Sequence, residues 1–520
     1  MKKNLIMALT VAFVFCTTNA VAQRNRSNRQ TVQRDTVAVL MEQASAGSAT
    51  AQNTLGNWYY NGQRVQQNYE TALKYWALSA KQGNVDAIGN MAMCYQLGRG
   101  TAKDSTMAVK LYKEAFKKGN KNVLQQHEDL VEKKNNLFSA TLLHEVYRDG
   151  IGVTANSKKA QFYLQKAAEG GDTNCQKAWA LQLINSEKNK EAVKWFKVLA
   201  DKNDLTGIYY YGYMLYKGMG IQQDKERGVQ LLKRAADRGL LSGNRQLAKA
   251  YYDGEGVKQD YATAVEHLKK AVTNRKPKFA DSQILLGKCY MNGQGVKQNY
   301  DQAIQWLAEA YTQNTKQAEE VKKVIDDEAD ATFRAYIEGL KKLYIDKNYA
   351  EAQKAFKKVE KAKNVEGSTM LAAVLMDEDN SKGDAKKAAK MLEKLVDKSA
   401  TAKYYLAQLY QEGRGVEKDT KKAGELILKA AAEDNGYAQE KAGDMYFEGR
   451  GVAQDYVKAV EYYLMAEAQS KLSAQSAKNL AKCYTMGISN LPDKDKAQER
   501  IEALNSIRNG NKMKDMLKNL

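Results

Sequence analysis

The stretch YFEGRGVAQDYVKAV, residues 446–460, contains two glycines two positions apart, then an acidic residue and a run with helical periodicity. Such a turn can hold a phosphate group, or it can simply reverse the chain. The same phrase returns as YQEGRGVEKDTKKAG from Tyr410, YMNGQGVKQNYDQAI from Tyr290 and YYDGEGVKQDYATAV from Tyr251. A nucleotide site is normally present once per domain, so the recurrence favours a structural turn.

Eight such phrases define a repeat. Three of the successive steps between their first glycines, from 62 to 98, 218 to 254 and 413 to 449, are 36 residues long. A fixed period of roughly 20 to 50 residues indicates a solenoid, in which similar units stack on one another. The first glycines are Gly62, Gly98, Gly150, Gly218, Gly254, Gly293, Gly413 and Gly449.

Each repeat predicts two helices joined by the glycine turn. Large apolar or aromatic residues recur seven and three positions before the first glycine, as in Leu286 and Tyr290, so one face of the first helix is buried. A small residue six positions before it, such as Gly287, lets a neighbouring helix approach closely. Six positions after the glycine, an Asn or Asp such as Asn299 is suited to cap the second helix. The glycines then provide the backbone geometry that reverses one helix into the next.

These residues resemble the Sel1-like repeat family, relatives of the tetratricopeptide repeats with a longer, glycine-bearing loop. The resemblance covers eight well-formed repeats and a degenerate ninth in residues 480–497, where Ser489 replaces the second glycine. Other departures are Arg64 at the second glycine of the first repeat and Thr101 for the usual valine in the second. The resemblance implies an all-α, right-handed superhelical solenoid of helix-turn-helix repeats. The presence of only 2 prolines and the lack of an alternating strand pattern agree with an all-α chain.

Two of the intervals between repeats are long enough to hold additional hairpins. The interval of 68 from Gly150 to Gly218 leaves room for a plain tetratricopeptide-type hairpin in residues 176–204. The interval of 120 from Gly293 to Gly413 holds another in residues 336–364 and a degenerate hairpin to about residue 398. We therefore expect a first block of repeats at 41–315, an acidic connecting segment at 316–332 that can articulate, a second block at 333–505 and a basic tail at 506–520. The alternative is an uninterrupted solenoid in which 316–332 is simply helical.

The chain begins with two lysines, an apolar run and the small-residue sequence Ala20-Val21-Ala22. This pattern predicts a signal peptide at residues 1–22, followed by a basic flexible leader at 23–40. Lipidation of Cys16 is the weaker alternative, because Phe15 rather than a small residue precedes it. No other stretch is apolar enough for a membrane span, so we expect an extracytoplasmic, periplasmic or surface protein. Removing Lys2 and Lys3 with the signal peptide lowers the formal net charge from +20 to +18.

The sequence gives little support for catalysis, and we expect no enzyme activity, cofactor or metal. The three histidines have separate interpretations: His267 takes a position that aromatic residues fill elsewhere and is expected to be packed, and His127 is expected to be exposed. His144 replaces a small residue, which indicates a local distortion or a functional role. His144-Glu145 begins like a zinc-protease motif, but Arg148 occupies the second ligand position. Three cysteines share one repeat position and are interpreted as core residues: Cys94, Cys289 and Cys483.

Partner binding is expected on the concave surface, on residues off the buried stripe of the first helices. A group of tyrosines and cations in the middle repeats has the composition of an interaction patch, with ordinary packing between repeats as the alternative. The patch residues are Tyr209, Tyr213, Tyr216, Arg245, Lys249, Tyr252 and Lys288.

Two functions follow from this reading. The first is a non-enzymatic scaffold or adaptor for envelope proteins or peptide segments. The second is an electrostatic binding module for anionic envelope polymer such as lipopolysaccharide, peptidoglycan or extracellular DNA. No arginine-rich helix or aromatic RNA-binding motif indicates a specific nucleic acid.

Overall fold

The computed structural model describes residues 36–272, 279–469, 471–485 and 512–520. Within these ranges all regular secondary structure is helical, which confirms the all-α solenoid. The predicted signal peptide, residues 23–35 of the predicted leader and the later part of the ninth repeat lie outside the described residues. Residues 36–45 are helical, because Leu40 and Met41 pack against Ala44, Ala51 and Leu55. The helix therefore begins inside the segment that the sequence assigned to the leader.

The chain forms two compact units, which we describe separately. The first holds the described residues up to Gly207 together with Met219–Ile221, and the second holds Ile208–Gly218 and the described residues from Gln222. The helices of the first unit are α2 (Ala49–Asn61), α3 (Tyr69–Lys81), α4 (Val85–Leu97), α5 (Ser105–Lys117), α6 (Lys121–Lys134), α7 (Leu137–Asp149), α8 (Ser157–Glu169), α9 (Thr173–Asn185) and α10 (Asn189–Asp201).

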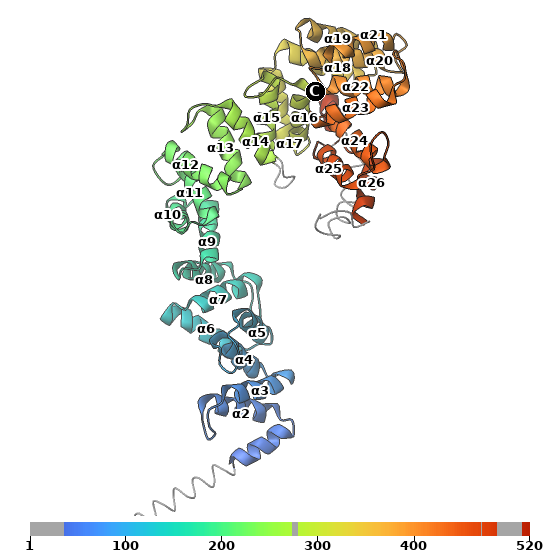
Figure 1. The fold of residues 1–520 in the computed structure, drawn as a ribbon. Helices are drawn as coiled ribbons and strands as arrows, with labels where there is room; N and C mark the ends of the chain where they lie inside the picture. Colours follow the sequence, from blue (N-terminus) through green and yellow to red (C-terminus); the bar gives the residue numbers. More distant parts are fainter. Residues whose placement is uncertain (1–35, 273–278, 470, 486–511) are drawn as a thin grey trace, which may run out of the picture. The chain divides into compact units, whose positions relative to one another are not determined.

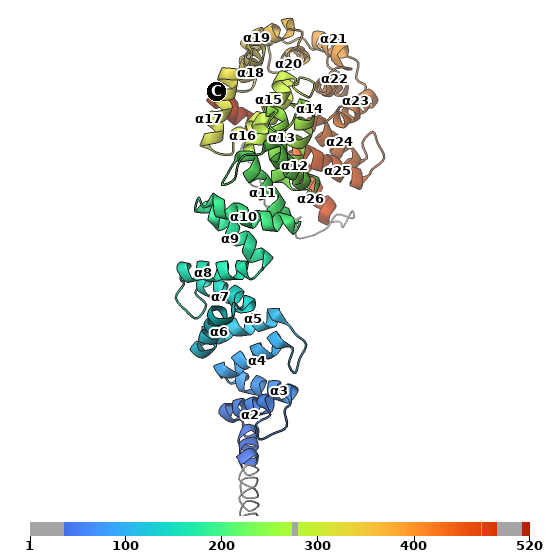
Figure 2. The same ribbon diagram turned by 90° about the vertical axis from the view of Figure 1, so that its left-hand side faces the viewer.

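The second unit begins within α11 (Leu205–Lys217) and stacks further helix pairs in chain order (Figures 1 and 2). Its other helices are α12 (Lys225–Asp237), α13 (Leu241–Asp253), α14 (Tyr261–Val272), α15 (Ala280–Asn292), α16 (Tyr300–Tyr311), α17 (Thr315–Lys323), α18 (Ala331–Tyr344), α19 (Tyr349–Lys361), α20 (Val365–Met376), α21 (Ala385–Leu395), α22 (Ala400–Glu412), α23 (Thr420–Ala432), α24 (Gly436–Glu448), α25 (Tyr456–Ala468), α26 (Ala474–Thr485) and α28 (Lys512–Asn519).

The repeat turn has the predicted geometry. The first glycine ends helix A in the left-handed conformation, as at Gly98 with φ 70°. The second glycine also has positive φ and lies against the preceding repeat, so a Cβ on Gly100 would lie 2.4 Å from the carbonyl oxygen of Tyr69. Arg64 holds the same place in the first repeat with φ 61°. The Asp104 carboxylate accepts from the N–H of Met107 at 2.9 Å, as expected of a helix cap.

Residues 316–332 pack against the core of the second unit through a few buried side chains. They form α17, a π-helical turn at Val324–Glu328 and the start of α18. Val321, Val324 and Ile325 make an apolar stripe within this acidic sequence and are buried in the same core as Leu307 and Phe333. The segment is thus largely helical and packed, while the division into two blocks at this point stays a prediction.

None of the described helices combines the length and the apolar composition needed to cross a membrane. The two plain hairpins predicted from the spacing appear as α9 with α10 and α18 with α19. The end of the predicted basic tail forms α28, whose Met516 and Leu517 are fully buried.

Candidate functional site

A cavity of about 1120 Å³ opens within the second unit. One wall is α16, the second helix of the sixth repeat. A second wall is formed where α20, α22 and α24 begin, together with Lys471 and Leu472 after α25. The start of α28, which packs on α16, also lines the cavity. The cavity is thus assembled from residues that are 100 or more positions apart, such as Asp301 and Thr401.

Asp301 joins these two walls. Its Oδ1 accepts a hydrogen bond from the Tyr336 hydroxyl, and its Oδ2 accepts one from Thr401 Oγ1 at 3.2 Å. Thr401 Oγ1 in turn accepts from Asn435 Nδ2 at 3.3 Å. Burial raises the pKa of the Asp301 carboxyl, while the two hydroxyl donors and Lys471 oppose that rise.

Glu366, at the start of α20, is a second carboxyl in the cavity wall. Burial and then the charge of Asp301 raise its pKa to about 7, and Lys297 works against this. The two carboxyls therefore resist ionising together. A basic or hydrogen-bond-donating group entering the cavity would favour their charged forms.

Aromatic rings supply much of the remaining wall. Tyr344, Tyr404, Tyr405 and Tyr437 all line it. The rings of Tyr404 and Tyr437 are stacked with centroids 5.8 Å apart, and Lys471 Nζ lies 4.5 Å from the Tyr437 centroid. Tyr437 is 39% exposed, which leaves ring surface open to a ligand. Rings with adjacent charged groups are typical of sites that bind peptide segments.

Two further hydrogen bonds connect the walls. Gln305 Nε2 on α16 donates to the carbonyl oxygen of Gln469 at 3.1 Å. Lys297 Nζ donates to the carbonyl oxygen of Lys398 at 3.4 Å. Together with Asp301 and Thr401, these contacts fix the separation of α16 from the later repeats. In addition, the indole N–H of Trp306, also in the wall, has no hydrogen-bond partner among the described residues.

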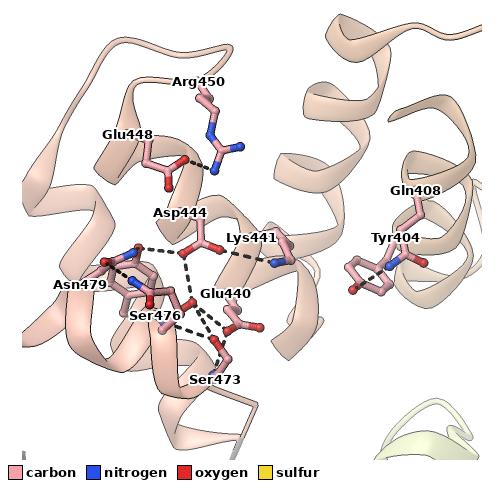
Figure 3. Close-up of polar contacts among 12 residues, drawn as sticks. Tyr404, Gln408, Glu440, Lys441, Asp444, Glu448, Arg450, Ser473, Ser476 and Asn479 are labelled. Carbon is pink, nitrogen blue, oxygen red and sulfur yellow. Dashed lines mark hydrogen bonds and ion pairs between the residues drawn. The ribbon is translucent and has the colours of Figure 1, made fainter. Parts of the chain in front are cut away.

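A polar network joins α24 to α26 and to Ser473 just before it (Figure 3). Glu440 accepts from the backbone N–H of Ser473 at 2.8 Å and from the Ser476 hydroxyl at 2.8 Å. Ser476 also lies 3.0 Å from Asp444, which accepts from the Tyr463 hydroxyl at 2.9 Å. The network holds the turn that carries Lys471 and Leu472 into the cavity.

The residues of the predicted patch lie along the second unit, where most of their polar groups already have partners. Tyr209 and Tyr213 are half-buried and stacked on each other, with centroids 6.2 Å apart. The remaining contacts are Arg245 with Asp281 at 2.7 Å, Lys249 with Asp253 at 2.8 Å, Lys288 with Glu328 at 2.6 Å, and the Tyr252 hydroxyl with Gln294 at 3.0 Å.

Tyr216 does not face outward as predicted. Its side chain is fully buried, its backbone lies against Gly228, and its hydroxyl donates to Glu255 at 2.6 Å. The reason is that the second helix of this repeat has a glycine where other repeats have alanine, so the two helices approach closely and enclose the ring. Tyr216 is therefore not available to a partner.

Tyr209 and Tyr213 of the predicted patch lie nine and five positions before Gly218, and the same two positions in the seventh repeat lead to part of the cavity. Nine and five positions before Gly413 lie Tyr404 and Gln408, whose side chains are hydrogen-bonded at 3.0 Å (Figure 3). In the eighth repeat the same positions hold Glu440 and Asp444, which both accept hydrogen bonds from Ser476 of α26. The carboxyls of Asp301 on α16 and Glu366 on α20 could not be identified from repeat positions, because only the folding of the array brings them together.

The histidines differ from expectation in one case. His127 is buried rather than exposed, since α6 packs on α5 and α7; its Nδ1 lies 2.8 Å from Ser139 Oγ, and burial lowers its pKa to about 4. His267 is packed as predicted, stacked on Tyr251. His144 Nδ1 donates to the carbonyl oxygen of Ala160 at 2.9 Å. Ala160 lies on α8, the helix that a small residue at position 144 would allow to approach closely.

The cysteines of the described chain are all free and buried, which confirms the core interpretation of the three that share a repeat position. Across residues 36–272, 279–469, 471–485 and 512–520, no group of His, Cys, Asp or Glu side chains is arranged to hold a metal ion.

Comparison with known proteins agrees with the repeat geometry. A model of the Sel1 repeat matches eight segments, which together cover more than half of the chain: residues 49–84, 85–120, 140–172, 206–240, 242–274, 280–315, 400–435 and 436–471. Protein sel-1 homolog 2 of Mus musculus is 36% identical over 70 residues, a match that covers 13% of this chain. The match spans only 10% of that relative's length.

Two solved structures are also similar. One is a protective antigen of uropathogenic Escherichia coli with an SLR fold, at 22% identity and a TM-score of 0.33, covering 91% of this chain and 98% of that one. The other is a Sel1 repeat protein from Oxalobacter formigenes, at 24% identity and a TM-score of 0.32, covering 57% of this chain and 81% of that one.

Proposed function

Because the chain belongs to the Sel1 repeat family, we propose that it is a non-enzymatic adaptor of the bacterial cell envelope that binds a protein segment in the cavity of its second unit. Sel1-repeat solenoids generally act as scaffolds for protein–protein interaction, and they are typically non-catalytic. The observation that carries the proposal is the cavity itself, a space of about 1120 Å³ with tyrosine rings and two buried carboxyls in its wall.

The lining favours a peptide over a uniform polymer. Two carboxyls (Asp301, Glu366) and two lysines (Lys297, Lys471) together present charges of both signs around aromatic surface. An extended segment with alternating apolar and charged side chains can contact both the charged groups and the aromatic rings. A uniformly anionic polymer would be attracted to the lysines but repelled by the carboxyls.

The envelope location rests on the N-terminal sequence. Residues 1–22 have the basic start, apolar run and small-residue end of a signal peptide. The partners proposed are accordingly envelope proteins, or peptide segments of them.

The excess of basic residues supports a second candidate, electrostatic binding of anionic envelope polymer. The chain has 81 Lys and Arg against 61 Asp and Glu. This binding would weaken steeply with salt, because attraction between exposed charges is screened within about 8 Å at physiological ionic strength.

Capture from envelope extract separates these candidates. The chain from Gln23 onward is used as bait at physiological salt and at about 0.5 M salt, where screening is strong. The adaptor proposal predicts a discrete protein retained at high salt and lost with Tyr404→Ala/Tyr437→Ala. Recovery of polymer alone, released by salt and indifferent to these tyrosines, would support the second candidate instead.

A matched variant tests the patch predicted from sequence. Tyr213→Ala/Tyr252→Ala changes two tyrosines of the same unit outside the cavity lining. Retention of the protein by this variant assigns binding to the cavity. Loss with this variant and retention by the cavity variant would assign it to the patch.

A further inference from the structure

Helix α28 packs on α16 and α18, on either side of the short α17 and its π-helical turn, which interrupt the regular repeat helices. In the regular part of the second unit, the second helix of one repeat packs directly on the first helix of the next, as α12 does on α13 and α23 on α24. After α16, the next segment is the short α17 and its π-helical turn. Helix α28 contacts both α16 and α18 at this interruption, and both views show the C-terminal end near α18 (Figures 1 and 2).

The contacts of α28 are those of an amphipathic helix in a groove. Met516 and Leu517 are fully buried in the core that contains Phe333 and Leu340, and Met513 and Leu520 pack partly against it. The four apolar residues are spaced i, i+3, i+4 and i+7, so they form one stripe. This spacing is the pattern by which helix-in-groove sites recognise their ligands.

Charged groups fix the orientation of the helix. Lys512 Nζ, just before the stripe, forms an ion pair with Glu309 Oε2 of α16 at 2.5 Å. Lys514 Nζ lies 5.9 Å from the ring centroid of Tyr344 on α18. The groove therefore matches both the apolar stripe and the basic residue that precedes it.

The helix depends on the groove for its stability. An isolated helix of 8 residues is too short to form in water, because nucleation costs more than so few hydrogen bonds return. It is also separated by some 200 residues from the helix whose Glu309 it contacts, so its position is set by docking and not by chain continuity.

We propose that the groove between α16 and α18 is a docking site for an amphipathic helix of a partner protein, and that α28 occupies this site in cis. The partner helix has apolar residues at i, i+3, i+4 and i+7 and a basic residue before the first. This inference rests on the adaptor function proposed above and names one kind of partner. Because Lys512, Met513 and Asp515 also line the cavity, a helix that displaces α28 changes the cavity wall.

Competition between α28 and the partner helix for the groove sets the apparent affinity of the partner. A helix in trans binds only the fraction of molecules whose groove is open, so its apparent affinity falls by that fraction. Opening the groove by substitution in α28 should raise the affinity accordingly.

The test uses a fluorescent peptide of residues 506–520 and the full chain. Fluorescence anisotropy compares its binding to the wild type and to Met516→Asp/Leu517→Asp, which keeps α28 out of the groove. We expect the variant to bind at least about tenfold more tightly than the wild type, and a peptide carrying the same two substitutions not to bind. No saturable binding to the variant, or equal binding to both chains, overturns the proposal.

A charge exchange tests the same groove without altering its apolar core. The chain with Glu309→Lys should prefer the peptide with Lys512→Glu over the natural peptide, and the wild-type chain should not. Absence of this preference contradicts the assigned orientation. A wild-type dimer in sedimentation experiments that is abolished by Met516→Asp/Leu517→Asp would make the occupant a second copy and overturn the assignment to a partner. Failure of the peptide to bind leaves the capture test with Tyr404 and Tyr437 unaffected, so the two proposals fail separately.

Discussion

Asp301 and Thr401 lie in different repeats, 100 residues apart, and are joined by a hydrogen bond of 3.2 Å across the cavity of the second unit. A solenoid whose units contact only their neighbours has no such bond. The contact shows that α16 and α22 are held at a defined separation, and the cavity between them is a property of the native fold.

Thr401→Val should destabilise the second unit by about 1–2 kcal/mol, because the buried Asp301 carboxyl loses a donor and the valine has nearly the same shape. Urea-induced unfolding measures the loss. The matched control is Thr54→Val, whose hydroxyl bonds only to Thr50 of its own helix. An equal, small effect of both substitutions would show that the bond to Asp301 does not hold the walls together.

Glu366→Gln should raise stability at alkaline pH. The unfolded chain ionises this carboxyl near pH 4.5 and the folded protein near pH 7, so the folded state binds more protons between these values. Its contribution to stability is complete below pH 4.5 and is lost as the pH rises through 7. At pH 8 the variant should therefore exceed the wild type by about 1–3 kcal/mol, and the difference should close toward pH 4.5.

Thermal unfolding at pH 5 and pH 8 measures this difference. Glu425→Gln, at an exposed position on α23, is the control for removing a surface carboxyl from the same unit. A constant offset for Glu366→Gln at both pH values would mean that the carboxyl is not buried beside Asp301.

His127 should make the first unit sensitive to acid. Burial lowers its pKa from 6.5 to about 4, so the unfolded chain takes up a proton that the folded protein refuses. Stability is complete above pH 6.5 and is lost as the pH falls toward 4, by about 2–3 kcal/mol. His127→Gln should flatten this part of the stability profile. NMR titration of the imidazole gives a direct check, and a pKa near 6.5 would contradict the burial of this ring.

The second glycine of a turn that lies against the preceding repeat, such as Gly152, should tolerate substitution far less than an equally left-handed glycine elsewhere. A Cβ at Gly152 would lie 2.0 Å from the carbonyl oxygen of Phe116, whereas one at Gly119 meets nothing within 4 Å. We expect Gly119→Ala to cost about 1 kcal/mol, the strain of positive φ alone, and Gly152→Ala about 3 kcal/mol or more. Equal losses of stability for the two variants in urea unfolding would show that the close approach of Gly152 to Phe116 is not the reason for this glycine.

The repeat architecture could be predicted from sequence because its causes are local. Glycine, cap and apolar positions recur in each unit, and Gly98, Asp104 and Leu286 take the conformations or burial that their positions indicated. Residues 316–332 were ambiguous because Val321 and Ile325 are surrounded by acidic residues in the sequence and are buried only by the fold.

The candidate site could not be predicted from the sequence in the same way. Asp301, Glu366 and Tyr437 belong to three separate helices, and their approach depends on the path of the whole second unit. Residues of the predicted patch lie mainly between successive repeats, as the ion pairs Arg245–Asp281 and Lys288–Glu328 show. Periodicity identifies the faces of a helix, but not which distant repeats those faces meet.

The most direct test of the adaptor function places a photoreactive phenylalanine analogue at position 437, in the cavity wall, and in a second chain at position 457. Val457 is 47% exposed in the same unit but does not line the cavity. After irradiation in envelope extract, we expect a discrete protein adduct at position 437 and none at position 457. Adducts of the same protein at both positions, or at neither, would contradict binding of a protein segment in the cavity.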